Sequence, residues 1–220
     1  MNVSKSAPIS KGVLLGASLG ALLISGCAKK GEITYNGITA VRSACPAVAI
    51  PVQTGDITLF NPSSSHTEEA LDVTAIMTNV RSTCDDSTDK VRTDITFDVD
   101  ARRADGGAAR DVTLPYFVVM MQGGTQIVSK RIGQASVHFE AGQARAHVSG
   151  RATATVDKSA ATLPDSVRKL LLRKRRAGEE DAATDPLSRP EIRGPLQRAT
   201  FEALVGFQLT DDQLKYNATR

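Results

Sequence analysis

Residues 91–101 read VRTDITFDVDA, in which apolar and polar side chains alternate at every step. Successive side chains of a strand point to opposite faces, so strict alternation separates the two kinds of side chain onto two faces. The pattern predicts a half-buried antiparallel strand, with one face in a hydrophobic core and the other in water.

Other stretches of the chain are also rich in residues that favour strands; they are 71–84, 112–121, 126–139, 144–156 and 201–209. The breaks between strands carry turn residues, namely Asn61-Pro62-Ser63, Asp105-Gly106-Gly107, Gly123-Gly124 and Gly142-Gln143. About seven strands in roughly 110 residues predict a mainly β fold, an antiparallel β-sandwich of two sheets. We expect an immunoglobulin-like or fibronectin-like arrangement, with a small open barrel as the alternative.

One hairpin is predicted in register. Gly142-Gln143 suits a two-residue type II′ turn, which would pair the strands on either side of it. His138 would then lie opposite His147 on a polar face, and Val137 opposite Val148 on an apolar face. A slip of one residue would mix the two faces, so the pattern favours this register.

Residues 157–200 have a different character. A helical run opens at Pro164, with Val167, Leu170 and Leu171 on one face. The segment 184–195 is rich in Pro, Gly and Ser and predicts a mobile excursion. Further on, Thr210-Asp211-Asp212-Gln213 has the T-x-x-Q form of a capping box, so we expect a short helix at the C-terminus.

The first residues of the chain fall into three zones. Lys5 and Lys11 are positive, Val13–Ser25 carries no charge, and small residues precede Cys27. This is the order of a secretory signal peptide. A membrane-spanning helix is the alternative, but it needs about 20 apolar residues, more than this run provides.

Ile24-Ser25-Gly26-Cys27 resembles the lipobox of bacterial lipoproteins. The resemblance implies that the Cys27 thiol receives a diacylglycerol, that the signal is cut before it, and that the new amine is acylated. Three acyl chains would hold the protein firmly, because a single chain binds a membrane only marginally. Ala28-Lys29-Lys30 stands where an Asp would mark inner-membrane retention, so the resemblance implies an outer-membrane protein, and we expect it to face the periplasm.

The resemblance covers only the first 30 residues and leaves the rest of the chain unmatched. The expected organisation is a signal peptide (1–26), a lipidated N-terminus and tether with little periodicity (27–43), a β-sandwich core (44–156), a helical and flexible excursion (157–200), and a final strand with a C-terminal helix (201–220).

The chain from Cys27 keeps 25 of the 27 Lys and Arg against 24 Asp and Glu, a net charge of +1. This balance gives no case for a nucleic-acid partner.

Two further cysteines follow Cys27, and they are Cys45 and Cys84. In an oxidising compartment two such cysteines most simply pair with each other. The loop they would close has about 40 residues, for which the chain-entropy description gives roughly 3–4 kcal/mol of stabilisation. A redox or metal-binding pair is the alternative, but neither a CxxC spacing nor a neighbouring His supports it, so we expect a structural disulfide.

His138 and His147 are the pair of residues in the predicted sheet best suited to bind a metal ion. Opposed imidazoles could hold Zn²⁺ or Cu²⁺ with help from Glu140, but a zinc site uses three or four protein ligands. The other His of the chain, His66, is distant in the sequence. We therefore expect two solvent-facing residues, with no metal and no cofactor.

A basic cluster follows the predicted helix; its members are Arg168, Lys169, Arg173, Lys174, Arg175 and Arg176. A helix with an apolar stripe and a basic end can lie on an anionic membrane or dock on an acidic partner. Lipopolysaccharide phosphates, peptidoglycan carboxylates and envelope proteins are the expected partner classes. A solvated helix whose positive charge is balanced by the acidic residues at 179–181 explains the cluster as well, and we favour this explanation.

The stretch Tyr116–Met121 is apolar on both faces of its predicted strand. A partner or an apolar ligand could use the additional face. A central strand covered by the helix of the 160s explains the pattern as well, and we favour this explanation.

The chain lacks the G-x-S-x-G, HExxH, P-loop and GxGxxG motifs that would point to an enzyme. We therefore expect a non-enzymatic envelope lipoprotein that binds or scaffolds other components of the cell envelope. The alternatives are a carrier of a small apolar ligand or lipid, which needs an apolar cavity, and an unrecognised periplasmic hydrolase, which needs His and acidic side chains gathered in a cleft.

Overall fold

The computed structural model of the chain describes residues 33–34, 37–38, 43–173, 178 and 184–219. Two compact units are present, Met1–Ala40 and Val41–Arg220. In the first unit, strands β1 (Ile33–Thr34) and β2 (Gly37–Ile38) pair antiparallel within the segment that the sequence predicts as a tether. The expected signal peptide and Cys27 lie outside the described residues.

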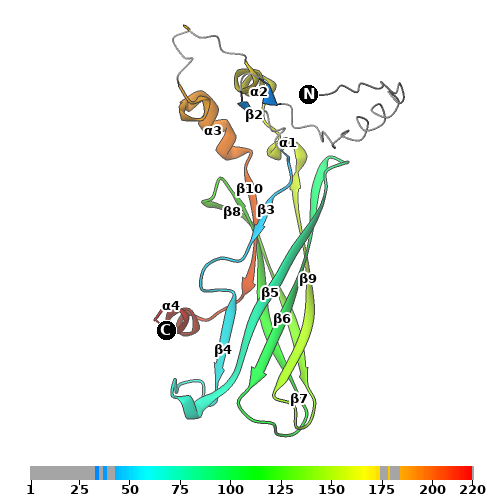
Figure 1. The fold of residues 1–220 in the computed structure, drawn as a ribbon, viewed down its shortest axis with the longest axis vertical. Helices are drawn as coiled ribbons and strands as arrows, with labels where there is room; N and C mark the ends of the chain where they lie inside the picture. Colours follow the sequence, from blue (N-terminus) through cyan, green and yellow to red (C-terminus); the bar gives the residue numbers. More distant parts are fainter. Residues whose placement is uncertain (1–32, 35–36, 39–42, 174–177, 179–183, 220) are drawn as a thin grey trace, which may run out of the picture. The chain divides into compact units, whose positions relative to one another are not determined.

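The second unit is a β-sandwich of two four-stranded sheets (Figure 1). The first sheet has the order β4 (Asp56–Phe60), β5 (Leu71–Asp85), β6 (Lys90–Arg103), β9 (Arg145–Asp157). The second sheet has the order β3 (Ala47–Ala49), β10 (Phe201–Phe207), β7 (Arg110–Gln122), β8 (Gln126–Phe139). Neighbouring strands are antiparallel except β3 and β10. The predicted mainly β, sandwich-like fold with a helical excursion and a C-terminal helix is confirmed.

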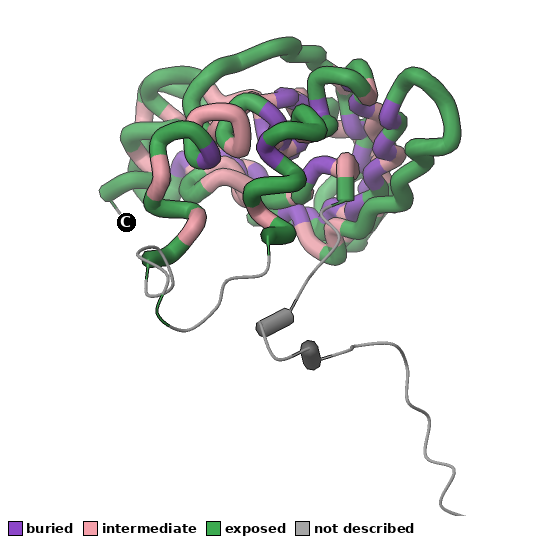
Figure 2. Tube along the Cα trace, turned by 90° about the horizontal axis from the view of Figure 1, so that it is seen from above, coloured by how far each residue is buried: buried purple, intermediate pink, exposed green. Residues whose placement is uncertain are grey.

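The alternation in β6 builds one wall of the core, as the sequence predicts. Ile95, Phe97 and Val99 are almost completely buried, whereas the residues between them lie on the outer face of the sheet. Leu114, Phe139 and Phe207 belong to the same core cluster on strands of the opposite sheet. Buried residues accordingly lie inside the trace, with exposed residues around them (Figure 2).

The predicted hairpin around Gly142-Gln143 is wrong. Strands β8 and β9 belong to different sheets, because β8 pairs with β7 and β9 pairs with β6. Val137 of β8 is completely buried and Val148 of β9 packs against the same core, from the opposite sheet. The polar-apolar alternation is therefore satisfied across the core instead of within one sheet.

Arg103 joins the loops at the end of the sandwich where β6 and β8 finish. The residue is 1% exposed, and its guanidinium donates hydrogen bonds to four backbone carbonyls in the loops that follow β6 and β8. The acceptors are Gln143 (2.7 Å), Ala108 (2.7 Å), Gly107 (2.9 Å) and Glu140 (3.1 Å). The guanidinium carbon also lies 5.3 Å from the centre of the Phe139 ring.

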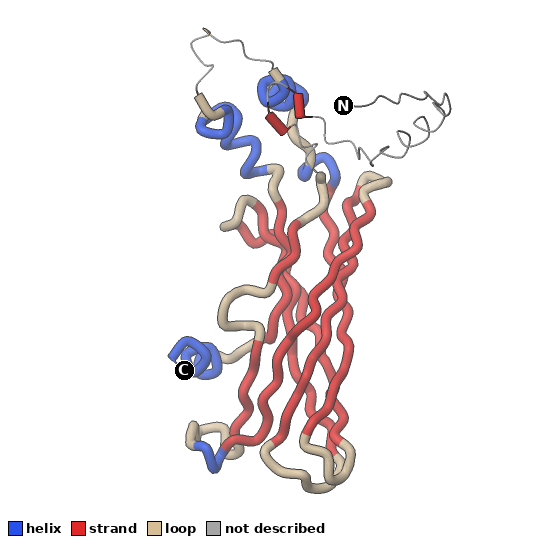
Figure 3. The backbone as a smooth tube through the Cα atoms, in the orientation of Figure 1, coloured by secondary structure: helices blue, strands red, loops and turns tan. Residues whose placement is uncertain are grey.

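Helices gather at the other end of the sandwich (Figure 3). They are α1 (Lys158–Ala161), α2 (Asp165–Leu172), the 3₁₀ turn η2 (Pro186–Ser188) and α3 (Pro190–Arg198). The sequence predicts a mobile excursion at 184–195, but the structure places η2 and most of α3 there. Pro190 occupies the first turn of α3, where its missing N–H costs no hydrogen bond, and the completely buried Ile192 anchors the helix.

Two short helices complete the unit, η1 (Glu68–Ala70) and α4 (Asp211–Thr219). The predicted capping box opens α4: the Gln213 N–H donates to the Thr210 hydroxyl (3.2 Å), and the Thr210 N–H donates to the Gln213 side chain (2.9 Å). Across the described residues, no helix combines the length and the apolar character needed to span a membrane.

Candidate functional site

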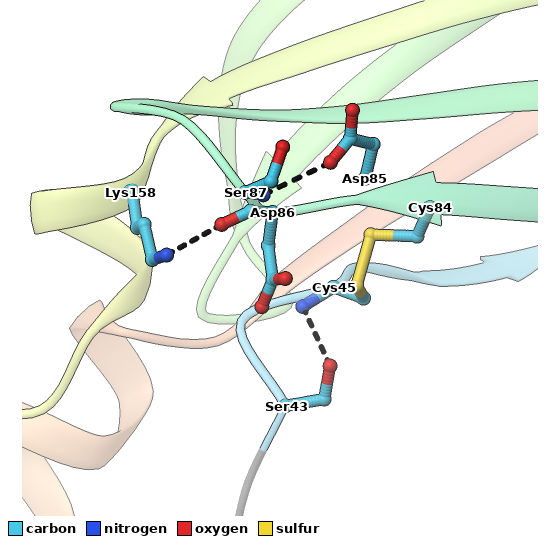
Figure 4. Close-up of a disulfide and its surroundings, with 7 residues drawn as sticks. All are labelled: Ser43, Cys45, Cys84, Asp85, Asp86, Ser87 and Lys158. Atoms are coloured by element: carbon cyan, nitrogen blue, oxygen red, sulfur yellow. Dashed lines mark hydrogen bonds between the residues drawn. A yellow bond between two sulfur atoms is a disulfide. The ribbon is translucent and has the colours of Figure 1, made fainter.

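Cys45 and Cys84 form the predicted disulfide. Cys45 lies just before β3 and Cys84 near the end of β5, so the bond ties the start of the second unit to the opposite sheet. The Lys158 amino group, at the start of α1, donates to the Asp86 carbonyl in the adjacent turn (Figure 4). The chain therefore enters the sandwich at the end that carries α1–α3.

Half of the predicted basic cluster lies in the described residues. Arg168, Lys169 and Arg173 are exposed on α2 and at its C-terminal cap, whereas Lys174, Arg175 and Arg176 fall outside. Arg168 makes an ion pair with Asp165 at 2.7 Å. Of the predicted apolar face, Val167 is buried and Leu171 half-buried, while Leu170 is more exposed.

His138 and His147 are not opposed, because their strands lie in different sheets. Each is exposed and contacts a carboxylate of the neighbouring strand: His138 Nδ1 lies 2.8 Å from Asp111, and His147 Nδ1 lies 2.9 Å from Asp100. Each hydrogen bond raises the pKa of its imidazole above the usual 6.5, since it favours the charged form. The described residues contain no group of three His, Cys, Asp or Glu side chains that could hold a metal ion.

The outer face of the β4-β5-β6-β9 sheet is a polar hydrogen-bonded surface. The Asp98 carboxylate accepts from Asn79 (2.7 Å) and Ser149 (2.8 Å), and these bonds hold the pKa of Asp98 below its usual value. The Asp94 carboxylate accepts from Arg92 and Thr153 in the same way. Since neighbouring side chains satisfy these carboxylates, they belong to a structural network.

Two open hollows lie along this sheet. One, of about 420 Å³, spans β4, β5, β6 and β9 and includes Thr58, Asp100 and Arg145. The other, of about 460 Å³, lies between β6 and β9 and includes Arg92, Asp94 and Arg151. Both are bordered by the exposed polar network, so neither resembles a closed apolar cavity.

The outer face of the β3-β10-β7-β8 sheet is, in contrast, apolar over the part near the C-terminal end of β7, whereas the rest of it carries polar residues such as Asp111 and His138. Val118 and Met120 of β7 face the core, so Phe117, Val119 and Met121 face outward. The strand register continues this face onto neighbouring strands, and its apolar members are Ala47, Ala49, Leu204, Phe117, Val119, Met121, Ile127 and Ile132. We call this set the apolar sheet face. Glu202 and Lys130 lie among these residues in the same register, and Val119 at the centre is buried.

The edge strand β8 carries the most open part of the apolar sheet face. The side chains of Ile127 and Ile132 are 62% and 54% exposed. Between them, the Lys130 amino group lies 5.6 Å from the centre of the Phe117 ring. The prediction that Tyr116–Met121 is a central strand is confirmed, but α2 packs mainly against α3, so its predicted cover by the helix of the 160s is wrong.

The third His lies in a separate aromatic cluster. The His66 ring is 5.0 Å from the Phe60 ring and 5.6 Å from the Tyr216 ring, where α4 packs on β4. His66, His138 and His147 thus belong to three different surroundings, and the structure does not bring them into one cleft.

No protein-family model, curated protein or solved structure matches this chain. The role of each candidate surface is therefore inferred from the geometry and chemistry of its residues.

Proposed function

We propose that this protein is a non-enzymatic lipoprotein of the bacterial outer membrane, held by acyl chains on Cys27 and facing the periplasm. Its sandwich serves as a scaffold that binds another envelope protein on the apolar sheet face. The lipobox resemblance supports the anchoring, and the disulfide between Cys45 and Cys84 fits an oxidising compartment.

The contrast between the two outer faces carries the proposal. Both sheets need an apolar inner face to build the core, and the β4-β5-β6-β9 sheet has the polar outer face expected of a sheet in water. The outer face of the other sheet is polar around Asp111 and His138 but apolar along Phe117, Val119 and Met121. The largest apolar patch on a monomeric protein, typically about 300–600 Å², is often an interaction surface. Exposed Ile127 and Ile132 widen this patch at an edge strand, where a partner has access to it.

The dimensions of the apolar sheet face favour a segment of another protein as its occupant. Four strands about 4.8 Å apart, with three outward rows of residues, span on the order of 400 Å². A stable protein interface buries about 800 Å² on each partner, so a second copy stacked on this face would bury too little. An extended or helical segment with an apolar side matches the available area.

The two alternatives have less support. A carrier of an apolar ligand needs an open interior, whereas large side chains such as Phe97, Phe139 and Phe207 fill the space between the sheets. A hydrolase needs His and acidic side chains around one cleft, whereas the three His residues are separated.

Site-specific photocrosslinking in intact cells tests the scaffold function. A photoreactive residue at Ile132 or Ile127 should yield an adduct with a specific envelope protein, while the same residue at the exposed Thr96, on the polar sheet, should not. The substitution Ile132→Asp should abolish the adduct formed from position 127 in protein that circular dichroism shows to be folded. Similar adduct patterns at positions 132 and 96, or none at 127 and 132, would overturn the proposed docking face.

A further inference from the structure

The helical end of the sandwich has the chemistry of a membrane-facing surface. We propose that helix α2 lies on the headgroups of an anionic phospholipid membrane, so that α1–α3 face the membrane and the Arg103 end points away from it. This orientation rests on the proposed anchoring at Cys27 and adds a second contact with the bilayer.

The entry point of the chain supports this orientation. Cys45 is bonded to Cys84, and Lys158 of α1 contacts the turn that follows Cys84, so the N-terminal segment joins the sandwich beside α1 (Figure 4). Fifteen residues, 28–42, separate Cys27 from Ser43. A segment of this length reaches no more than about 55 Å, which keeps the entry end near the bilayer.

Charge is distributed unevenly along the mature chain. The described residues between 158 and 198 include seven Lys and Arg against three Asp and Glu, a net charge of +4, whereas residues 43–157 and 199–219 carry eleven Lys and Arg against seventeen Asp and Glu, a net charge of −6. The acids of the β5–β6 turn, Asp85, Asp86 and Asp89, lie at this end too, but Lys158 is bonded to that turn. Anionic lipids attract such clusters of cations, within about a Debye length of the surface.

Helix α2 combines these cations with exposed leucine side chains. Val167 is 6% exposed and Leu171 is half-buried, so they define the inner side of the helix. Lys169 lies on the opposite side, and Leu172, next to it on the helical surface, is 57% exposed. Exposed leucine among cations is the pattern by which surface helices bind the headgroup region of a bilayer.

The chain has no Trp, so single tryptophan reporters can test the contact. The variants Leu172→Trp and, in the opposite end loop, Ala141→Trp would be prepared as the lipid-bearing protein in vesicles of phosphatidylethanolamine and phosphatidylglycerol. Brominated acyl chains in the bilayer should quench the Leu172→Trp fluorescence several-fold more than that of Ala141→Trp. Equal quenching of the two reporters would overturn the orientation.

A lipid-free chain of residues 28–220, which contains the whole of the compact unit Val41–Arg220, separates this contact from the anchoring. Lys169→Glu with Arg173→Glu should lower its partitioning into phosphatidylglycerol vesicles at least about tenfold, and phosphatidylcholine vesicles should bind it weakly. Arg102→Glu with Arg145→Glu, the same charge change on the polar sheet, should have little effect. If both pairs have the same effect, or wild type binds both vesicle types alike, the contact at α2 is refuted. If the lipid-free chain binds through α2 but the full-length protein isolated from cells carries no acyl chain on Cys27, the proposed anchor is refuted and the contact at α2 stands.

Discussion

Replacing Arg103 by Met should remove the guanidinium that joins the loops after β6 and β8, at nearly constant side-chain volume. Four hydrogen bonds to backbone carbonyls would be lost. Hydrogen bonds to a charged group contribute about 1.5–3 kcal/mol each, so their simple sum would exceed about 6 kcal/mol. Water can reach the loop carbonyls in the variant, and the buried charge no longer needs desolvation, so we expect the free energy of unfolding to fall by about 3–5 kcal/mol.

Urea unfolding followed by far-ultraviolet circular dichroism measures this loss. The neighbouring substitution Arg102→Met is a matched control, because Arg102 is exposed on the same strand and should change stability by less than about 0.5 kcal/mol. If Arg103→Met stayed within about 1 kcal/mol of the wild type, the four-carbonyl contact would not hold this end of the sandwich together.

Three further predictions concern other contacts. Cys45→Ser with Cys84→Ser should lower the free energy of unfolding by about 3 kcal/mol, and an unchanged urea midpoint would contradict a stabilising disulfide. In NMR titrations the pKa of His138 should lie above 6.5, and Asp111→Asn should bring it back; the stabilisation from this pair is complete at acidic pH and disappears as the pH rises through the raised pKa. Thr210→Ala should lower the free energy of unfolding in urea by about 1 kcal/mol because it removes the cap of α4, and an unchanged urea midpoint would contradict a stabilising cap.

The strands could be predicted from the sequence because alternation is a local property. β6 needs one face in the core and one in water, and its eleven central residues show this without reference to any partner. The choice of partner is not local, which is why the hairpin of β8 and β9 is wrong. Two strands that face each other across a core need the same alternation as two strands side by side.

The apolar sheet face was only partly visible in the sequence. Residues 116–121 show that β7 is apolar on both sides, but the matching residues of β8 do not alternate regularly. A register shift between Met120 and Met121 places Ile127 opposite Met121, so Val128 interrupts the pattern. The helix α3 was missed for a related reason, since Pro190 and Pro195 are typical of loops when the burial of Ile192 is unknown.

Labelling and mass spectrometry of Cys27 show directly whether the protein carries a lipid anchor. Cells expressing the wild type should incorporate labelled palmitate into the protein, and mass spectrometry should show a mature chain that begins at a lipid-bearing Cys27. Cys27→Ser should incorporate no label and accumulate as the uncleaved precursor. A mature band of normal size from Cys27→Ser, or an unlabelled wild-type protein, would contradict the account of a lipid-anchored envelope scaffold.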